Sequence, residues 1–348
     1  MRSRLVRDLS TADRQVYLDV PMRRVHCSEC GVKTEKLDWL AALPRYTQRF
    51  ALFVGERCRE STVSDVARQT GLHWHTVKEL DKLYMQEQLR RAGPPQPQRI
   101  GIDELSIGKH HQYRIVVSDL DTGRPIWFGG MDRSEASLNL FYATLSPENK
   151  AQLKIAVMDM WKAFRKSTLH HAPQTLIIYD KFHILRHLQD AMDKTRRHEY
   201  RRLDGDERRY IKGQRYTLLS HWKNLDQDGQ QSLKELFRVN RRLNKAYLLK
   251  EQFGQLWDYY RPEWARKFFA KWKASLRWQR LPEFEKFATM IEKHWDGIIP
   301  YCDPDNKVSL GLVEGLNNLI RSLQRRAFGY RDEDYLRLKI LTCKLPAL

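Results

Sequence analysis

One short stretch constrains the fold more than any other. A Pro-rich linker at residues 93–97 precedes residues 99–105, in which Ile100 and Ile102 flank a glycine and apolar and polar residues alternate. This period-two pattern predicts a strand. The strand carries Asp103 at its end, where an unpaired carboxylate is costly to bury. Asp103 is therefore either hydrogen-bonded in place as a structural group or a ligand for a cation.

Further strand and helix signals follow this stretch. Strand-like runs lie at residues 99–107, 112–120, 124–130, 153–158 and 175–179. The turn-forming residues 121–124 join the second and third runs and predict a hairpin. Helical patterns cover residues 134–145 and begin again near Trp161 and at Lys181.

Three antiparallel strands followed by two strand–helix units are the order of an RNase H-like sheet. In that sheet the first and fourth strands are neighbours, so Asp103 would face Asp159, which ends the fourth run. Asp180 ends the fifth run and is followed by His183. We therefore expect an α/β protein built on an RNase H-like mixed sheet.

Positive charge narrows the class of partner. The 348 residues carry a formal net charge of +19, and residues 201–280 alone hold 20 Lys and Arg against 9 Asp and Glu. Clustered positive charge suits a polyanion, usually nucleic acid, with general solubility as the alternative. Residues 200–300 read as long helices, whose many Trp and Tyr residues either stack on bases or form the core of a helical bundle.

Secretion and membrane association are not indicated. The first 20 residues are charged throughout, no apolar run reaches transmembrane length, and five cysteines without framework spacing fit a reducing cytosol. Cys27 and Cys30 form a C-x2-C pair, which is either half of a zinc ribbon or two free thiols, because structural zinc takes four ligands. We expect residues 1–40 to form a partial zinc-ribbon-like segment of a cytoplasmic, nucleoid-associated protein.

Residues 41–92 look helical and have the rhythm of a helix-turn-helix. A short helix is expected to end near Gly71 and a second to begin at about Trp74. The second helix would present His75, Thr76 and Lys78 to base edges and phosphates. A small helical hairpin with no role in DNA binding is the alternative.

Residues 308–330 are amphipathic at helical period. The expected apolar stripe consists of Leu312, Leu316, Leu319 and Leu323. The expected polar edge consists of Glu314, Asn317, Asn318, Arg321 and Arg325. A carboxylate with cations below it is either a solvated salt-bridge face or, beside two strand-end aspartates, part of a site.

Together, Asp103, Asp159 and Glu314 resemble the DDE triad of RNase H-like transposases. Four stretches sharpen the match: residues 101–104, 157–161, 180–183, and 313–318 followed by 325–330. They look like the ISL-three family of bacterial insertion-sequence transposases, over about residues 17–341. The resemblance implies a ribbon at 1–40, a helix-turn-helix at 41–92, a catalytic core at 98–200 and 301–348, and a large all-α insertion at 201–300.

The resemblance also implies a chemistry. Asp103, Asp159 and Glu314 would hold two Mg²⁺ or Mn²⁺ ions, because hard cations prefer carboxylate oxygens, and the site would cleave DNA and transfer strands. Asp180 and His183 would support these ligands or contact the scissile DNA, with a plain helix N-cap as the alternative for Asp180. The implied partners are double-stranded DNA, as transposon ends and as target, and further copies of the chain in a homodimer or larger complex.

One departure from the family concerns zinc. The family's ribbon carries two Cys pairs, whereas this sequence has only Cys27 and Cys30, so either the reading frame starts late or the ribbon has decayed. Zn²⁺ binding is therefore doubtful.

Two other functions stay open: an RNase H-like nuclease without strand transfer, and an inactive or domesticated DNA-binding protein. The helix-turn-helix favours a transposase over the nuclease, because transposon ends must be found by sequence. The presence of all three carboxylates argues against a loss of chemistry.

Overall fold

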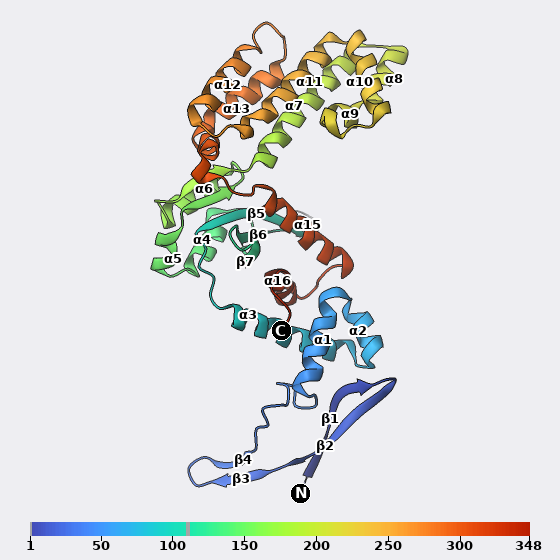
Figure 1. The fold of residues 1–348 in the computed structure, drawn as a ribbon, viewed down its shortest axis with the longest axis vertical. Coiled ribbons are helices and arrows are strands. Elements are labelled where there is room, and N and C mark those ends of the chain that lie inside the picture. The colour runs from blue at the N-terminus through green and yellow to red at the C-terminus, as the bar shows by residue number, and fades with distance from the viewer. Residues whose placement is uncertain (1, 109–111) are drawn as a thin grey trace. The chain divides into compact units, whose positions relative to one another are not determined.

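The computed structural model describes residues 2–108 and 112–348 (Figure 1). The chain groups into two compact units. The first comprises Met1–Gln96, Gly123–Phe128 and Gly315–Leu348, and the second comprises Pro97–Thr122 and Gly129–Glu314.

Two short antiparallel sheets form the beginning of the first unit. Their strands are β1 (Arg2–Thr11) with β2 (Arg14–Met22), and β3 (Arg24–Cys27) with β4 (Gly31–Thr34). Asp8 of β1 is buried and accepts hydrogen bonds from Arg49 Nε at 2.7 Å and from the Thr47 hydroxyl at 2.8 Å. The Arg49 guanidinium outweighs the effect of burial and holds the pKa of Asp8 below its usual range. These hydrogen bonds tie the first hairpin to the helices that follow.

Three helices make the helix-turn-helix: α1 (Gln48–Glu60), α2 (Val63–Thr70) and α3 (Trp74–Ala92). The Thr62 hydroxyl caps α2, and Gly71 ends it in the left-handed conformation at φ +68°. Both predicted boundaries, near Gly71 and at Trp74, are confirmed. The helical expectation for residues 41–47 is wrong, because helix α1 starts only at Gln48, after its N-cap Thr47.

Helix α16 (Glu333–Thr342) completes the core of the first unit. Its Tyr335 and Leu338 pack with Tyr84 and Met85 of α3. A buried charge network joins the same elements, since Lys339 Nζ lies 2.6 Å from a carboxylate oxygen of Asp81 and donates to the Cys58 carbonyl at 2.8 Å. The Tyr335 hydroxyl also donates to Asp81. Burial raises the pKa of Asp81, and the charge of Lys339 opposes that shift.

A five-stranded mixed sheet has the order β7-β6-β5-β8-β9, and the second unit contains all of its strands except β7. The strands are β5 (Arg99–Gly108), β6 (Gln112–Asp119), β7 (Arg124–Gly129), β8 (Ile155–Met158) and β9 (Leu176–Tyr179). β5 pairs antiparallel with β6 and parallel with β8, and β8 pairs parallel with β9. All five predicted strands are present, and the expected pairing of the first with the fourth is confirmed.

Helices α4 (Glu135–Ala143), α5 (Pro147–Gln152) and α6 (Lys162–His171) connect the strands after β7. After β9 the chain is helical, as expected, through α7 (Lys181–Arg202), α8 (Gly205–Gly213), α9 (Arg215–Leu219), η1 (Trp222–Asn224), α10 (Gln227–Val239), α11 (Arg241–Phe253), η2 (Gly254–Asp258), α12 (Pro262–Ala274), α13 (Pro282–Lys293), α14 (Trp295–Ile298), η3 (Ile299–Cys302) and η4 (Pro304–Asn306).

Some aromatic residues of this helical segment lie in the core, as one of the two expectations had it, and others are exposed. Phe253 sits in the core and contacts Trp257, Trp272 and Phe287 with ring centroids 4.8–5.6 Å apart. Other rings face solvent instead: Tyr260, Trp264 and Trp278. Core packing therefore accounts for some of these residues, and the exposed ones remain available to a partner.

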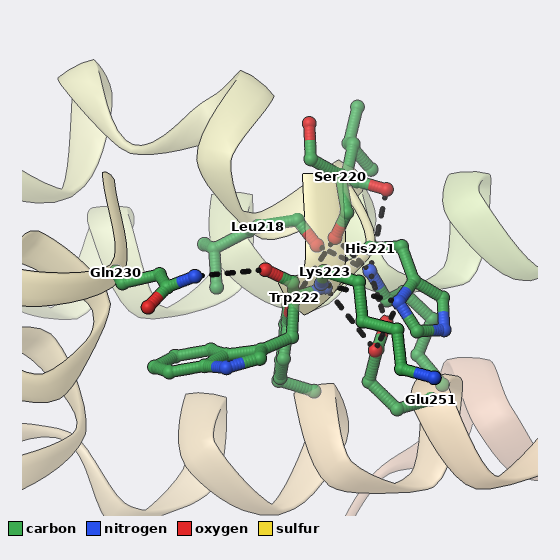
Figure 2. A network of polar contacts seen from close by, with 10 residues as sticks. Leu218, Ser220, His221, Trp222, Lys223, Gln230 and Glu251 are labelled. Atoms are coloured by element: carbon green, nitrogen blue, oxygen red, sulfur yellow. Dashed lines mark hydrogen bonds and ion pairs between the residues drawn. The ribbon is translucent and has the colours of Figure 1, made fainter. Parts of the chain in front are cut away.

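Figure 2 shows a network of polar contacts in the helical segment, which includes Leu218, Ser220 and Glu251. Lys250 contacts the same three residues. Its buried ammonium donates to the carbonyls of Leu218, Leu219 and Ser220 at 2.6–3.2 Å, at the C-terminal end of α9. Carbonyls at a helix C-terminus have no partner within their own helix. Burial lowers the pKa of Lys250, and the Glu251 carboxylate at 3.1 Å opposes that shift. A single cation thus ties a short helix to α11.

Helix α15 (Gly311–Arg326) ends in a Schellman motif. The N–H of Gly329 donates to the Gln324 carbonyl and the N–H of Phe328 to the Arg325 carbonyl, both at 3.1 Å. Phe328 therefore takes the left-handed position, at φ +53°, that glycine usually occupies. A side chain there costs about 1 kcal/mol.

Replacing Lys339 with Met should destabilise the first unit by about 3–5 kcal/mol, because one member of a buried ion pair is left without its partner. Urea unfolding followed by tryptophan fluorescence measures the change. The matched control is the double variant Asp81→Asn/Lys339→Met, which buries no charge and keeps an acceptor for the Tyr335 hydroxyl. We expect it to be clearly more stable than the single variant, and equal stability of the two would contradict the role given to this pair.

Candidate active site

Two neighbouring strands deliver a carboxylate to the same edge of the sheet. In the parallel pair β5–β8, Ile102 lies opposite Met158, and Asp103 and Asp159 come next along the two strands. Each carboxylate is fixed locally, because the N–H of Glu104 donates to Asp103 at 2.7 Å and the N–H of Met160 donates to Asp159 at 2.6 Å.

Asp180 directly follows β9, the third parallel strand, and His183 lies in the first turn of α7. Asp180 Oδ1 accepts from the N–H of Phe182 at 2.9 Å and so caps α7, while its Oδ2 lies 3.1 Å from His183 Nδ1. The other ring nitrogen, His183 Nε2, lies 3.9 Å from Asp103 Oδ1. The N-cap role is therefore present, and the same carboxylate also orients His183 toward Asp103.

The electrostatics of this cluster favour an added cation. Burial raises the pKa of Asp103 to about 6, although the charge of His183 acts to lower it. Burial also disfavours the imidazolium of His183. The hydrogen bond to Asp180 and the charges of Asp159 and Asp103 outweigh that effect and raise the pKa of His183 to about 9. One imidazolium thus faces three carboxylates.

Within residues 2–108 and 112–348, no group of three or more His, Cys, Asp or Glu side chains is arranged to hold a metal ion. The donor chemistry nonetheless fits a hard divalent cation, because Asp103 of β5 and Asp159 after β8 supply carboxylate oxygens. The Asp103 side chain is 13% exposed, and His183 Nε2 lies 3.9 Å from its Oδ1.

Glu314 lies in the first turn of α15 and is exposed. Its neighbour Val313 packs against β5 so closely that a methyl group on Gly101 would come within 2.4 Å of Val313 Cγ2. The start of the helix that carries Glu314 therefore rests on the strand that carries Asp103. Only glycine at position 101 permits this approach.

The apolar face of α15 differs from the predicted stripe. The buried residues are Val313, Leu316, Asn317 and Ile320, whereas Leu312, Leu319 and Leu323 are half-buried. Asn317 was expected on the polar edge and is instead 4% exposed. The rest of the predicted edge is exposed, namely Glu314, Asn318, Arg321 and Arg325.

A second cluster beside the carboxylates escaped the sequence analysis. Arg133 Nη1 lies 2.9 Å from Glu104 Oε1, and its guanidinium lies 5.0 Å from the ring centre of Trp161. The Trp161 indole N–H donates to the Arg133 carbonyl at 2.8 Å. Glu104 follows Asp103, and Trp161 lies two positions after Asp159. In the sequence, the sign of this cluster was that Glu104 and Trp161 lie so close to the two predicted catalytic aspartates.

The predicted DNA-contact residues open helix α3. His75 is exposed and Thr76 is half-buried. Lys78 differs from the expectation of a solvent-facing cation: its side chain is 18% exposed and its ammonium lies 2.6 Å from Asp332. Trp74, which the sequence analysis did not select, is 48% exposed and stacks on His75 with ring centres 3.9 Å apart.

Asp103 was expected at a strand end, but it lies within β5, just past the end of the parallel pairing with β8, while Asp159 directly follows β8. A helix-turn-helix together with a mixed sheet that carries this pair of aspartates is compatible with the class of DNA-processing proteins. Family comparison supports this class. Residues 100–340 match a transposase family, residues 35–84 match the helix-turn-helix domain of transposase family ISL3, and residues 1–30 match the zinc-finger of transposase IS204/IS1001/IS1096/IS1165. The chain belongs to the ISL3 family of transposases, and the expected family is confirmed.

Individual relatives agree with the family match. A Bordetella parapertussis protein, described as the transposase for insertion sequence element IS1001, is 34% identical over 341 residues, which cover 97% of this chain and 83% of the relative. Mycobacterium tuberculosis proteins described as transposases for insertion sequence element IS1557 are 26% identical over 357 residues, covering 95% of this chain and 79% of the relative.

The zinc-finger match does not complete a zinc site. Cys27 ends β3 and Cys30 precedes β4, and a hydrogen bond from the backbone N–H of Cys30 lowers the pKa of the Cys27 thiol. These two sulfurs are half of the four ligands that structural zinc takes. The pair therefore does not fit a structural zinc ion by itself.

Among the described residues, no helix is both long and apolar enough to cross a membrane.

Replacing Gly101 with Ala should lower DNA strand cleavage roughly 10²-fold, because the added methyl displaces the start of α15, and misplacement by about 1 Å has effects of that size. DNA binding should be unchanged. A labelled-DNA cleavage assay measures the effect.

The added variant Val313→Ala in the same chain should recover part of the activity, since it removes the atom that the new methyl meets. Gly213→Ala is the matched control, because a methyl group there meets open space. Full activity of Gly101→Ala alone would contradict the positioning role of this close packing.

Proposed function

We propose that this chain is a DDE transposase with an RNase H-like catalytic core, in which Asp103, Asp159 and Glu314 are the catalytic carboxylates. The observation that carries the proposal is the parallel pairing of β5 with β8, since it directs Asp103 and Asp159 to one edge of the sheet. The strand order β7-β6-β5-β8-β9 supports the RNase H-like fold. The packing of Val313 on Gly101 supports the inclusion of Glu314.

The three carboxylates would hold two divalent ions, Mg²⁺ or Mn²⁺. Bound there, the ions would supply activation of the attacking oxygen and neutralisation of the leaving oxygen. The chain's own residues prepare the site. Asp180 holds His183 in one orientation, and His183 in turn faces Asp103.

Cationic and amide groups beyond the triad would bind the DNA backbone. Asn318, Arg321 and Arg325 are exposed on α15 after Glu314, and Arg321 Nη1 lies 3.3 Å from the Asn318 side-chain oxygen. Arginine suits phosphate because its planar donors match phosphate oxygens. Asn317 is buried, so we assign it to the packing of α15 instead of DNA binding.

The helix-turn-helix at residues 41–92 would recognise the terminal inverted repeats, with His75 and Thr76 at the start of the recognition helix. The helical insertion at 201–300 would lie between two parts of the catalytic core, at 98–200 and 301–348, with the ribbon-like segment at 1–40. The active complex would contain two or more copies of the chain, on transposon ends and target DNA.

Asp103→Asn, Asp159→Asn and Glu314→Gln should each lower Mg²⁺-dependent strand cleavage by roughly 10³-fold or more, because metal ligation supplies several kcal/mol of transition-state stabilisation. DNA binding should persist. The test uses the full chain and a labelled duplex that carries the ends of its element, with cleaved and joined products separated on a gel.

Asp206→Asn is the matched control, because its carboxylate is 92% exposed and lies in the helical insertion. Undiminished cleavage by the Asp103 variant would remove it from the triad. Cleavage without joined products by the unaltered chain would favour a nuclease over a transposase.

Replacing both His75 and Thr76 with Ala should weaken binding to the end sequence by roughly 1–3 kcal/mol for each base that these side chains read, while leaving binding to unrelated duplex nearly unchanged. Competition binding at fixed salt separates the two affinities. An equal weakening on both duplexes would mean that this helix contacts phosphates only.

A further inference from the structure

Phe328 is the most exposed of the large apolar side chains described, with 98% of its surface open to solvent. It stands at the tip of the segment between α15 and α16. An aromatic ring that buries almost nothing contributes nothing to the stability of the fold. The ring is therefore available to a partner outside the chain.

The backbone beneath this ring is also unfavourable. Phe328 adopts φ +53°, and Gly329 beside it adopts φ +98°. A bulky side chain is rare at positive φ, and such outliers cluster at functional positions. The hydrogen bonds from Phe328 to Arg325 and from Gly329 to Gln324 hold the strained conformation in place. The ring is thus presented outward on a fixed support.

The surroundings of Phe328 suit DNA. It shares the lining of a cavity of about 530 Å³ with α2 and with Trp74 and Lys78 of the recognition helix. The same lining holds five Lys and Arg against two Asp, namely Arg68, Lys78, Arg326, Arg331, Lys339, Asp65 and Asp332. Of these cations, Arg68, Lys78 and Lys339 pair with Asp65, Asp332 and Asp81, which leaves Arg326 and Arg331 as the cations that line the cavity with Phe328. An exposed aromatic ring with cations beside it is complementary to a polyanion whose bases can stack.

We propose that Phe328 is a wedge that inserts between adjacent base pairs of the DNA held by the helix-turn-helix and unstacks them. This inference rests on the proposed recognition of transposon ends. Apolar side chains that enter a base step kink the duplex, and flanking cations compensate the phosphates that the kink brings together. The exposed Arg325 and Arg331 lie on either side of Phe328 in the chain.

The test scans the bound DNA with 2-aminopurine, whose fluorescence rises when its base loses a stacking neighbour. Duplexes tiled across the DNA flanking the gene first identify the segment that the full chain binds. The fluorophore is then placed at each position of that segment in turn. We expect a rise of several-fold at one base step with the unaltered chain.

Phe328→Gly is the informative variant, because glycine relieves the strained backbone. Its melting temperature should not fall, so a loss of signal cannot be attributed to unfolding. We expect Phe328→Gly to abolish the fluorescence rise and Phe328→Trp to keep it. Phe53→Ala is the matched control, since Phe53 is an exposed phenylalanine of the same unit on α1, and its signal should be unchanged.

The outcomes separate this inference from the proposed function. Specific binding without any rise would overturn the wedge and leave end recognition intact. A persistent rise in Phe328→Gly would also overturn it, because another group would then unstack the step. If the unaltered chain bound all of the tiled duplexes equally well, that result would contradict the proposed recognition of the transposon ends, and the wedge proposal would fail with it. A change in sedimentation of Phe328→Gly without DNA, together with no rise in the unaltered chain, would assign the ring to a second copy instead.

Discussion

The parallel hydrogen bonding between β5 and β8 is the constraint on which the catalytic proposal depends. These strands are far apart in the sequence, and their pairing sets the register of Ile102 opposite Met158. Side chains alternate between the two faces of a sheet. A shift of the pairing register by one residue would therefore place the Asp103 side chain on the opposite face from its present one. The close approach of Val313 to Gly101 adds a third element to the same strand, and it depends on the absence of a side chain at position 101.

Asp81 and Asp103 lie in different charge environments. Asp81 is buried, and Lys339 at 2.6 Å and the Tyr335 hydroxyl both contact its Oδ2, whereas its Oδ1 has no hydrogen-bond partner among the described residues. Asp103 has His183 at 3.9 Å, with further carboxylates close by, and burial raises its pKa to about 6. The fold thus gives Asp81 a close ammonium and places Asp103 near an imidazole and further carboxylates.

Local sequence patterns predicted most of the elements. An alternating run at residues 99–107 and four further strand-like runs predicted all five strands, and Gly71 marked the end of α2 because glycine tolerates positive φ. The stripe of α15 was displaced because burial there includes Asn317, a polar residue that hydropathy assigns to the surface. The Arg133–Glu104–Trp161 cluster and the Lys78–Asp332 pair join residues distant in the sequence, so no local pattern contains them. The conformation of Phe328 was not predicted for another reason, because phenylalanine rarely adopts the positive φ that the backbone has there.

The network around Asp81 has a consequence for synthesis of the chain. Tyr335 lies 254 positions further along and Lys339 follows it, so the ribosome has made most of the protein before either can contact Asp81. Until then the face of α3 that carries Asp81, Tyr84 and Met85 lacks the helix that covers it, and the helix-turn-helix stays poorly packed. An unfinished chain, or a fragment that ends before α16, should therefore bind DNA weakly and be cleaved readily by proteases.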